Sequence, residues 1–167
     1  MSETSARQLT LANAPAIGQY WEGQGGIYAG IMPDYVGQSP KHLIFSVDEA
    51  TKLEWGGYGA AEPDAQSLHD GEANSDALTK CTHPHPAAQW ANEYTKDGHT
   101  DFHLPSRKEW EVAGVTIQNT FARDVWYWSS SAQSPTSAYG INFNGMDLVH
   151  LYKSYPGNAR AVRTIPA

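Results

Sequence analysis

Residues 101–114, DFHLPSRKEWEVAG, carry signals for a strand, a stop and a helix within one short stretch. Residues 101–104 alternate polar and apolar side chains, as a short half-buried strand does. Pro105 ends this strand, because proline biases the residue before it away from helical backbone angles. Ser106 and Glu109 stand in the S-x-x-E pattern of a capping box, in which each side chain bonds to the other residue's backbone N–H. The pattern predicts a structural corner and not a reaction centre.

Helical patterns lie on both sides of this corner. The helix that follows it is expected to end at Gly114, with Trp110 facing the core. Residues 85–98 form the clearest helix, since their apolar side chains recur at helical spacing. Residues 70–80 begin as a turn and lead into a short helix. The candidate N-caps of that short helix are Asn74 and Ser75.

Strand patterns dominate the last third of the chain. Asn144-Gly145 stands between two alternating runs in residues 137–154, which is the strongest short-range signal for a hairpin. Further strands are expected at residues 41–47, 51–60, 124–131 and 159–167. These elements predict an α+β fold in which two helices pack on an antiparallel sheet with long loops.

Size and charge limit the function classes. The 167 residues favour one domain, residues 17–167, preceded by an N-terminal arm, residues 1–16. The net charge is −7, and the stretch up to Leu104 holds 5 basic and 14 acidic residues. Such a surface repels polyanions, so nucleic acid is not an expected partner. The start of the chain lacks the pattern of a signal peptide, and no apolar run is long enough to predict membrane insertion.

Several short motifs occur in an order that resembles a known family. They are "DG" (70–71), "ANS" (73–75), "AAQWANEY" (87–94), "DFHLPSRKEW" (101–110), "YWSSS" (127–131) and "ARAVR" (159–163). Together they resemble the Lcl C-terminal-domain family over residues 18–165. "HLPSRKEWEVAG" is also similar to a segment of the formylglycine-generating, sulfatase-modifying domains, whose broader fold the phage tropism determinants share. The resemblance implies a C-type lectin-like fold with its termini close together and an irregular ligand-facing side.

Metal and nucleophile candidates in the first half of the chain are expected to be structural. Cys81 is the only cysteine, which excludes an internal disulfide and favours a small buried side chain over a nucleophile. His83 and His85 alternate around proline and could share a face, but with Cys81 alone nearby the ligand set of a zinc site stays incomplete. Glu62-Pro63-Asp64 resembles the triplets of calcium-dependent lectins, yet their companion triplet is missing.

Two further candidates come from the second half of the chain. His99, Asp101 and His103 would share one face of a strand and could bind a metal, but a polar, solvent-facing strand edge is the favoured interpretation. Ser130 has no nucleophile-elbow context around it. No catalytic residue, cofactor or metal is therefore expected, and the protein is expected to fold without metal.

The hairpin and the loop after it offer the best candidate binding surface. Aromatic side chains with Asn, Asp and His on loops supply the rigid stacking area and adaptable hydrogen bonds that a glycan or protein receptor needs. On the hairpin, Tyr139, Ile141 and Phe143 are expected on one face. The predicted ligand-binding residues are Asn142, Asn144, Asp147, His150, Tyr152 and Tyr155.

These observations predict a binding module and not an enzyme. The expected protein is a phage virion surface or tail-fibre protein, made in the host cytoplasm, that recognises a host-surface receptor or glycan. The alternative is a structural virion decoration protein that binds only neighbouring virion subunits. A homo-oligomer such as a trimer remains open, because no heptad or collagen-like repeat indicates one.

Overall fold

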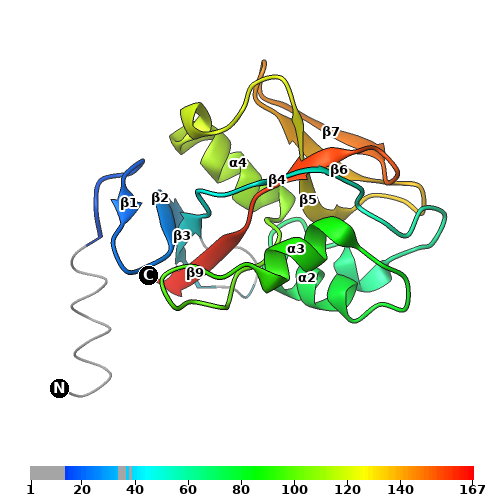
Figure 1. Cartoon of the computed structure of the whole chain (residues 1–167), viewed down its shortest axis with the longest axis horizontal. Coiled ribbons are helices and arrows are strands. Elements are labelled where there is room, and N and C mark those ends of the chain that lie inside the picture. The colour runs from blue at the N-terminus through cyan, green and yellow to red at the C-terminus, as the bar shows by residue number, and fades with distance from the viewer. Residues whose placement is uncertain (1–13, 34–36, 38) are drawn as a thin grey trace.

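Two β-sheets and three α-helices make up the described part of the computed structural model, which covers residues 14–33, 37 and 39–167 (Figure 1). The predicted N-terminal arm, residues 1–16, lies almost wholly outside the described residues. The first sheet has the order β1-β2-β3-β9 and is antiparallel throughout. Its strands are β1 (Tyr20–Trp21), β2 (Gly26–Met32), β3 (Lys41–Phe45) and β9 (Val162–Pro166). The earliest and the last strands of the fold therefore share one sheet.

The second sheet has the order β4-β8-β5-β6-β7 and ends on β7. Its strands are β4 (Ala50–Leu53), β5 (Trp126–Ala132), β6 (Ser137–Asn142), β7 (Asp147–Tyr152) and β8 (Gly157–Ala159). All neighbours are antiparallel except β5 and β8, which pair in parallel at one position. The predicted hairpin is confirmed as β6 and β7.

The mixed α+β prediction is confirmed, and the described residues hold three α-helices where the fold prediction named two. The helices are α2 (Gly71–Thr79), α3 (Pro86–Glu93) and α4 (Arg107–Thr116), with 3-10 turns η1 (Pro63–Ala65) and η2 (Gln118–Thr120). Asp70 caps α2 by accepting a hydrogen bond from the Ala73 N–H at 3.0 Å. The predicted caps Asn74 and Ser75 instead lie buried within the helix.

The corner at the start of α4 is built as the sequence predicted. Ser106 Oγ accepts from the Glu109 N–H at 3.2 Å, and Glu109 Oε1 accepts from the Ser106 N–H at 2.8 Å. The helix continues two residues beyond Gly114, so the predicted end was wrong. A Cβ at position 114 would lie 2.3 Å from Met146 Cε. Glycine is needed there for the close approach of the β6–β7 turn and not for a helix end.

Residues 101–104 do not form the predicted strand. Their only bridge in the described structure joins His103 to Val162. Asp101 turns outward to the Arg163 guanidinium at 2.9 Å, while His103 turns inward to Glu109. Because these two polar partners lie on opposite sides, residues 101–104 form a single bridge and not a regular strand.

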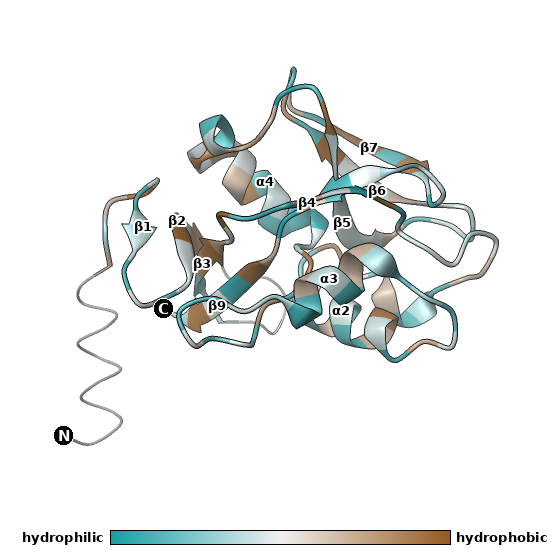
Figure 2. Cartoon of the chain, in the orientation of Figure 1, coloured by the Kyte–Doolittle hydropathy of each residue, from teal (hydrophilic) through white to brown (hydrophobic). Residues whose placement is uncertain are grey.

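Two hydrophobic cores hold the elements together. One lies around α4 between the two sheets, where Trp110 and Tyr127 are fully buried. The other lies between α2, α3 and the five-stranded sheet, around Trp55 and Trp128. The Trp110 indole N–H donates to the Trp128 carbonyl at 3.0 Å and so links them. Figure 2 shows the hydrophobic residues concentrated on β3 and other central strands, with more hydrophilic loops around them.

Within the described residues, every helix is too short and too polar to cross a bilayer.

Candidate functional site

The six predicted ligand-binding residues lie on β7, at the end of β6 and in the loops that flank β7. Tyr152 is 67% exposed and Tyr155 is 43% exposed. His150 is also exposed, and all three line an open pocket of about 820 Å³. The other walls of this pocket come from the β5–β6 connection and the segment after β7: Gln133, Ser134, Thr136, Ser137, Leu151, Ser154 and Pro156. The structure therefore brings three of the six predicted residues together around one cavity.

The remaining predicted residues lie at the far end of the hairpin. Asn142 supports the turn: its Nδ2 donates to the Val125 carbonyl at 3.0 Å and its Oδ1 accepts from the Asn144 N–H at 2.8 Å. Asn144 and Asp147 are exposed but do not line the pocket. Their place in a ligand face stays a prediction, and Asn142 has a structural partner on each side.

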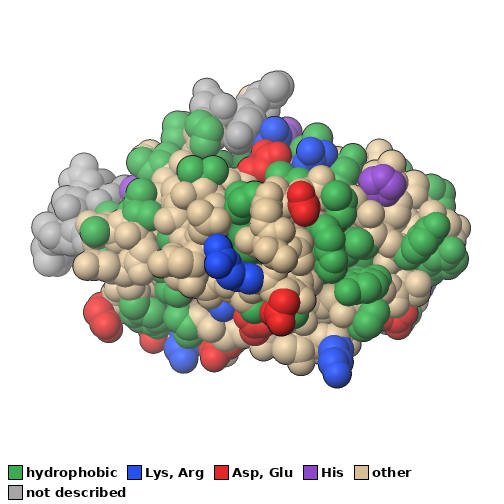
Figure 3. Space-filling model, turned by 90° about the horizontal axis from the view of Figure 1, so that it is seen from above, with side chains coloured by type: hydrophobic (Ala, Val, Ile, Leu, Met, Phe, Trp, Pro, Cys, Tyr) green, Lys and Arg blue, Asp and Glu red, His purple; other side chains and the backbone are tan. Residues whose placement is uncertain are grey.

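Tyr58 is an exposed aromatic residue that the sequence did not single out. It is 57% exposed, and its ring centroid lies 6.3 Å from that of Tyr152. Its loop is fixed beside the pocket because the Gly59 N–H donates to the Pro135 carbonyl at 2.8 Å. Figure 3 shows hydrophobic side chains on both halves of the face seen from above, with groups of them on the right. Tyr58 lies in a glycine-rich loop, 94 residues before Tyr152 in the sequence, which gave no signal for this contact.

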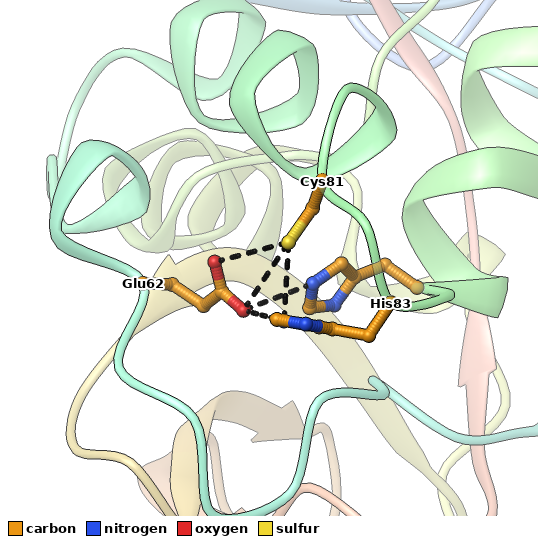
Figure 4. A group of neighbouring side chains, drawn as sticks. Glu62, Cys81 and His83 are labelled. Carbon is orange, nitrogen blue, oxygen red and sulfur yellow. Dashed lines mark hydrogen bonds and ion pairs between the residues drawn. The ribbon is translucent and has the colours of Figure 1, made fainter.

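A second constellation lies in the loops beside α2 and α3. Glu62 precedes η1, and Cys81, His83 and His85 lie between α2 and α3 (Figure 4). One ligand atom from each of these four residues lies within 4.8 Å of all the others. From the sequence, the set of ligands around the two histidines was predicted to be incomplete. The structure corrects this expectation, because Glu62 supplies the fourth donor.

Hydrogen bonds orient the buried imidazole of His85. Its Nδ1 lies 2.9 Å from the Trp55 carbonyl, which can only accept, so the ring carries a proton on Nδ1. Its Nε2 lies 3.2 Å from Glu62 Oε1. The side chain is fully buried, and this burial lowers the pKa of the imidazole despite the opposing effects of Trp55 and Glu62. Burial therefore disfavours the charged form of His85, and its Nε2 faces the Glu62 carboxylate.

The carboxylate of Glu62 is ionised in this setting. Burial raises the pKa of its carboxyl group, but the hydrogen bond with His83 and nearby positive charges outweigh burial and lower it. One of these charges is Lys153, a fully buried side chain whose Nζ donates to the Ala60 carbonyl at 2.8 Å. Burial lowers the pKa of Lys153 in turn. Glu62, which the sequence linked to lectin triplets, thus faces histidines and not an open sugar site.

The other candidates are not brought together. His99 contacts the Gly23 carbonyl at 2.8 Å, Asp101 pairs with Arg163, and His103 is buried against Glu109. The prediction that these three side chains share a face is therefore wrong. Ser130 is buried, and its hydroxyl lies 3.4 Å from Asn74 Nδ2, an amide that cannot act as a general base.

Comparisons with known proteins give one informative likeness. No family model matches the chain, and no curated protein matches it. Among solved structures, a fimbrial protein from Bacteroides ovatus is similar, with a TM-score of 0.51 and 13% identity over 72% of this chain. The chain spans about a third of that protein, 35% of its length. At this identity the likeness concerns the fold alone.

Proposed function

We propose that this chain is a non-enzymatic binding module of C-type lectin-like type, which presents the pocket beside β7 to a ligand on a cell surface. The observation that carries the proposal is the pair of exposed rings, Tyr152 and Tyr155, at one open pocket of about 820 Å³. Exposed aromatics are unfavourable in water unless a partner covers them, so such a cluster marks an interaction site.

The chemistry of the pocket suits a glycan or a polar protein loop. Tyr152 and Tyr155 offer flat stacking area, with Tyr58 close to the first of them. Ser134, Thr136 and other hydroxyl or amide side chains stand around the rings as hydrogen-bond donors and acceptors. Acidic and basic side chains are absent from the residues that line this pocket, apart from His150. A neutral, hydroxyl-rich ligand fits this surface better than a charged one.

The biological setting is part of the proposal. The similar solved structure is a fimbrial protein, and fimbriae are surface appendages, which is compatible with a surface-binding role here. The resemblance to the Lcl C-terminal-domain family and to phage tropism determinants extends this to a phage virion surface or tail-fibre protein that binds a host receptor. The pairing of the first sheet's early strands with β9 supports the lectin-like assignment, since that fold brings its ends together.

One observation favours the alternative, a virion decoration protein that binds neighbouring subunits. Among the described strands, β7 stands at the edge of its sheet and pairs only with β6. Val149 on this strand is exposed. An exposed edge strand with an apolar residue can pair with a strand of another chain.

The test is a double variant, Tyr152→Ala with Tyr155→Ala, compared with the control Val115→Ala. Val115 is 79% exposed on α4 and lies outside the pocket. Binding is measured on a glycan array and by adsorption to host cells. Loss of two interface rings should weaken binding at least about tenfold, while the thermal unfolding of both variants stays close to that of the wild type. Unchanged binding by the double variant would refute the proposal.

The same variants separate the two functions. The decoration role holds if the wild type binds neither glycans nor cells but assembles with copies of itself or with other virion subunits, and if the double variant loses this assembly. Size-exclusion chromatography with light scattering provides this readout.

A further inference from the structure

We propose that Glu62, Cys81, His83 and His85 bind one Zn²⁺ ion as a structural metal centre. This site is separate from the pocket proposed for ligand binding, and the inference does not depend on that function. Its basis is the convergence of four donor atoms, each of which lies within 4.8 Å of the others.

The donors converge to distances at or somewhat below those between the ligands of a tetrahedral ion. Zinc bonds of roughly 2.0–2.3 Å place the ligand atoms of a tetrahedron about 3.3–3.8 Å apart. Cys81 Sγ lies 3.1 Å from His83 Nε2 and 3.7 Å from Glu62 Oε2, and His85 Nε2 lies 3.2 Å from Glu62 Oε1. Glu62 Oε1 is also in contact with His83 Nε2. Figure 4 shows the Glu62 carboxylate and the Cys81 thiol reaching toward the same point, the carboxylate from the left and the thiol from above.

A cation resolves a conflict that hydrogen bonds leave in place. Because the Trp55 carbonyl fixes the proton of His85 on Nδ1, the Nε2 of a neutral ring has only a lone pair to offer. That lone pair faces the Glu62 carboxylate, which is also an acceptor. A metal ion between the two acceptors satisfies both.

The contact from His85 to the Trp55 carbonyl is what a zinc ligand needs from its surroundings. Metal-binding histidines commonly donate the N–H of the other ring nitrogen to a carbonyl or carboxylate, which fixes the tautomer and aims the free nitrogen at the metal. The Trp55 ring also packs edge-on against His85, with ring centroids 4.9 Å apart. The imidazole is thus held in place before any metal arrives.

A cysteine–histidine catalytic relay does not fit the same atoms. In such a relay the histidine uses one ring nitrogen for the nucleophile and the other for the orienting acid. Here Cys81 Sγ and Glu62 Oε1 both contact the same nitrogen, Nε2 of His83. Several donors crowded around one point are the arrangement of a ligand cage and not of a proton relay.

The donor types select zinc. A thiolate and two imidazoles are preferred by Zn²⁺ over Ca²⁺ or Mg²⁺, which take oxygen ligands. Four protein ligands close the coordination sphere, as in structural sites. Gly57 gives the rings room, because a Cβ there would lie 2.9 Å from His83 Nε2 and 2.9 Å from His85 Cε1. The ion would cross-link the loop that ends at Glu62 with the connection between α2 and α3.

The experiment uses full-length protein without a histidine tag. Zinc is measured in the purified protein by elemental mass spectrometry, then removed with a chelator and replaced by Co²⁺. We expect one metal ion per chain, the intense visible absorption of tetrahedral Co²⁺, and a thiolate-to-cobalt charge-transfer band in the near ultraviolet. Chelator should lower the melting temperature by several degrees, and Zn²⁺ should restore it.

Variants assign the ligands. His83→Gln replaces a partly exposed ligand and should weaken Co²⁺ binding at least tenfold, and Cys81→Ser should remove the charge-transfer band. His99→Gln changes an exposed histidine outside the cluster and should bind Co²⁺ as the wild type does. If Cys81→Ser does not fold, the wild-type cobalt spectrum and His83→Gln still decide. The proposal is overturned by substoichiometric uptake with no thermal shift, by a weak octahedral cobalt spectrum, or by wild-type affinity in His83→Gln.

Discussion

Removing the carboxylate of Glu109 should cost more stability than any other single change at the α4 corner. Glu109 is fully buried and accepts from the Ser106 N–H at 2.8 Å and from His103 Nε2 at 3.1 Å. His103 Nδ1 is buried with no hydrogen-bond partner among the described residues, so the proton of this ring sits on Nε2 and points at the carboxylate. Glu109→Ala therefore leaves two buried donors without an acceptor.

The magnitude follows from these two contacts. A buried donor that loses its partner costs about 1–3 kcal/mol, and Glu109→Ala leaves two such donors, the Ser106 N–H and the His103 Nε2–H. We expect the free energy of unfolding to fall by about 3–5 kcal/mol, out of the ~5–15 kcal/mol typical of a domain. Glu109→Gln keeps an acceptor for Ser106 and the same shape, and should cost about 1 kcal/mol.

Urea unfolding followed by tryptophan fluorescence measures this difference, since Trp110 is buried on the same helix. Glu111→Ala is the matched control: it removes the same residue type from α4, where the carboxylate pairs at the surface with Arg107 and Lys108. Removal of these surface ion pairs should lower the free energy of unfolding by no more than about 1 kcal/mol. The reasoning fails if Glu109→Ala and Glu111→Ala destabilise the protein equally.

Two further predictions concern the same corner. Ser106→Ala removes the N-cap of α4 and should lower the free energy of unfolding by about 1 kcal/mol while ligand binding stays intact. The same urea assay measures this loss, and unchanged stability would contradict the role of the cap. Acid should also destabilise the fold: burial raises the pKa of Glu109, but His103 and the Ser106 N–H lower it below its ordinary value. The stability that the ionised Glu109 carboxylate contributes is complete above about pH 4.3 and is lost as the pH falls through the lower pKa of the folded state. Glu109→Gln should therefore show a flatter dependence of stability on pH over this acidic range.

Local patterns predicted the parts of the fold that local physics determines. The capping box at Ser106 and Glu109 needs only residues three apart, and the Asn144-Gly145 turn needs only its own backbone angles. Trp128 was expected in the core and is fully buried. Each of these features rests on contacts within one element or one turn, so the sequence around it was sufficient.

Features that depend on distant partners were missed. Residues 101–104 alternate like a strand, but Arg163 and Glu109 draw neighbouring side chains to opposite sides. The donor set around His83 looked incomplete because Glu62 is 21 residues away along the chain. Its approach requires the loop at Gly56 and Gly57, whose positive φ angles of 90° and 66° no periodic pattern encodes.

The loop from Trp55 to Glu62 connects the proposed metal centre with the proposed binding pocket. Its first residue orients His85 through its carbonyl, and its last residue is itself a zinc ligand in the proposed centre. Between them Tyr58 faces Tyr152, and the buried Lys153, next in sequence to Tyr152, donates to the Ala60 carbonyl. Binding costs less free energy when a contact residue is ordered in advance, because less conformational entropy is lost. We infer that the metal centre, by fixing both ends of this loop, would hold Tyr58 ready beside the pocket.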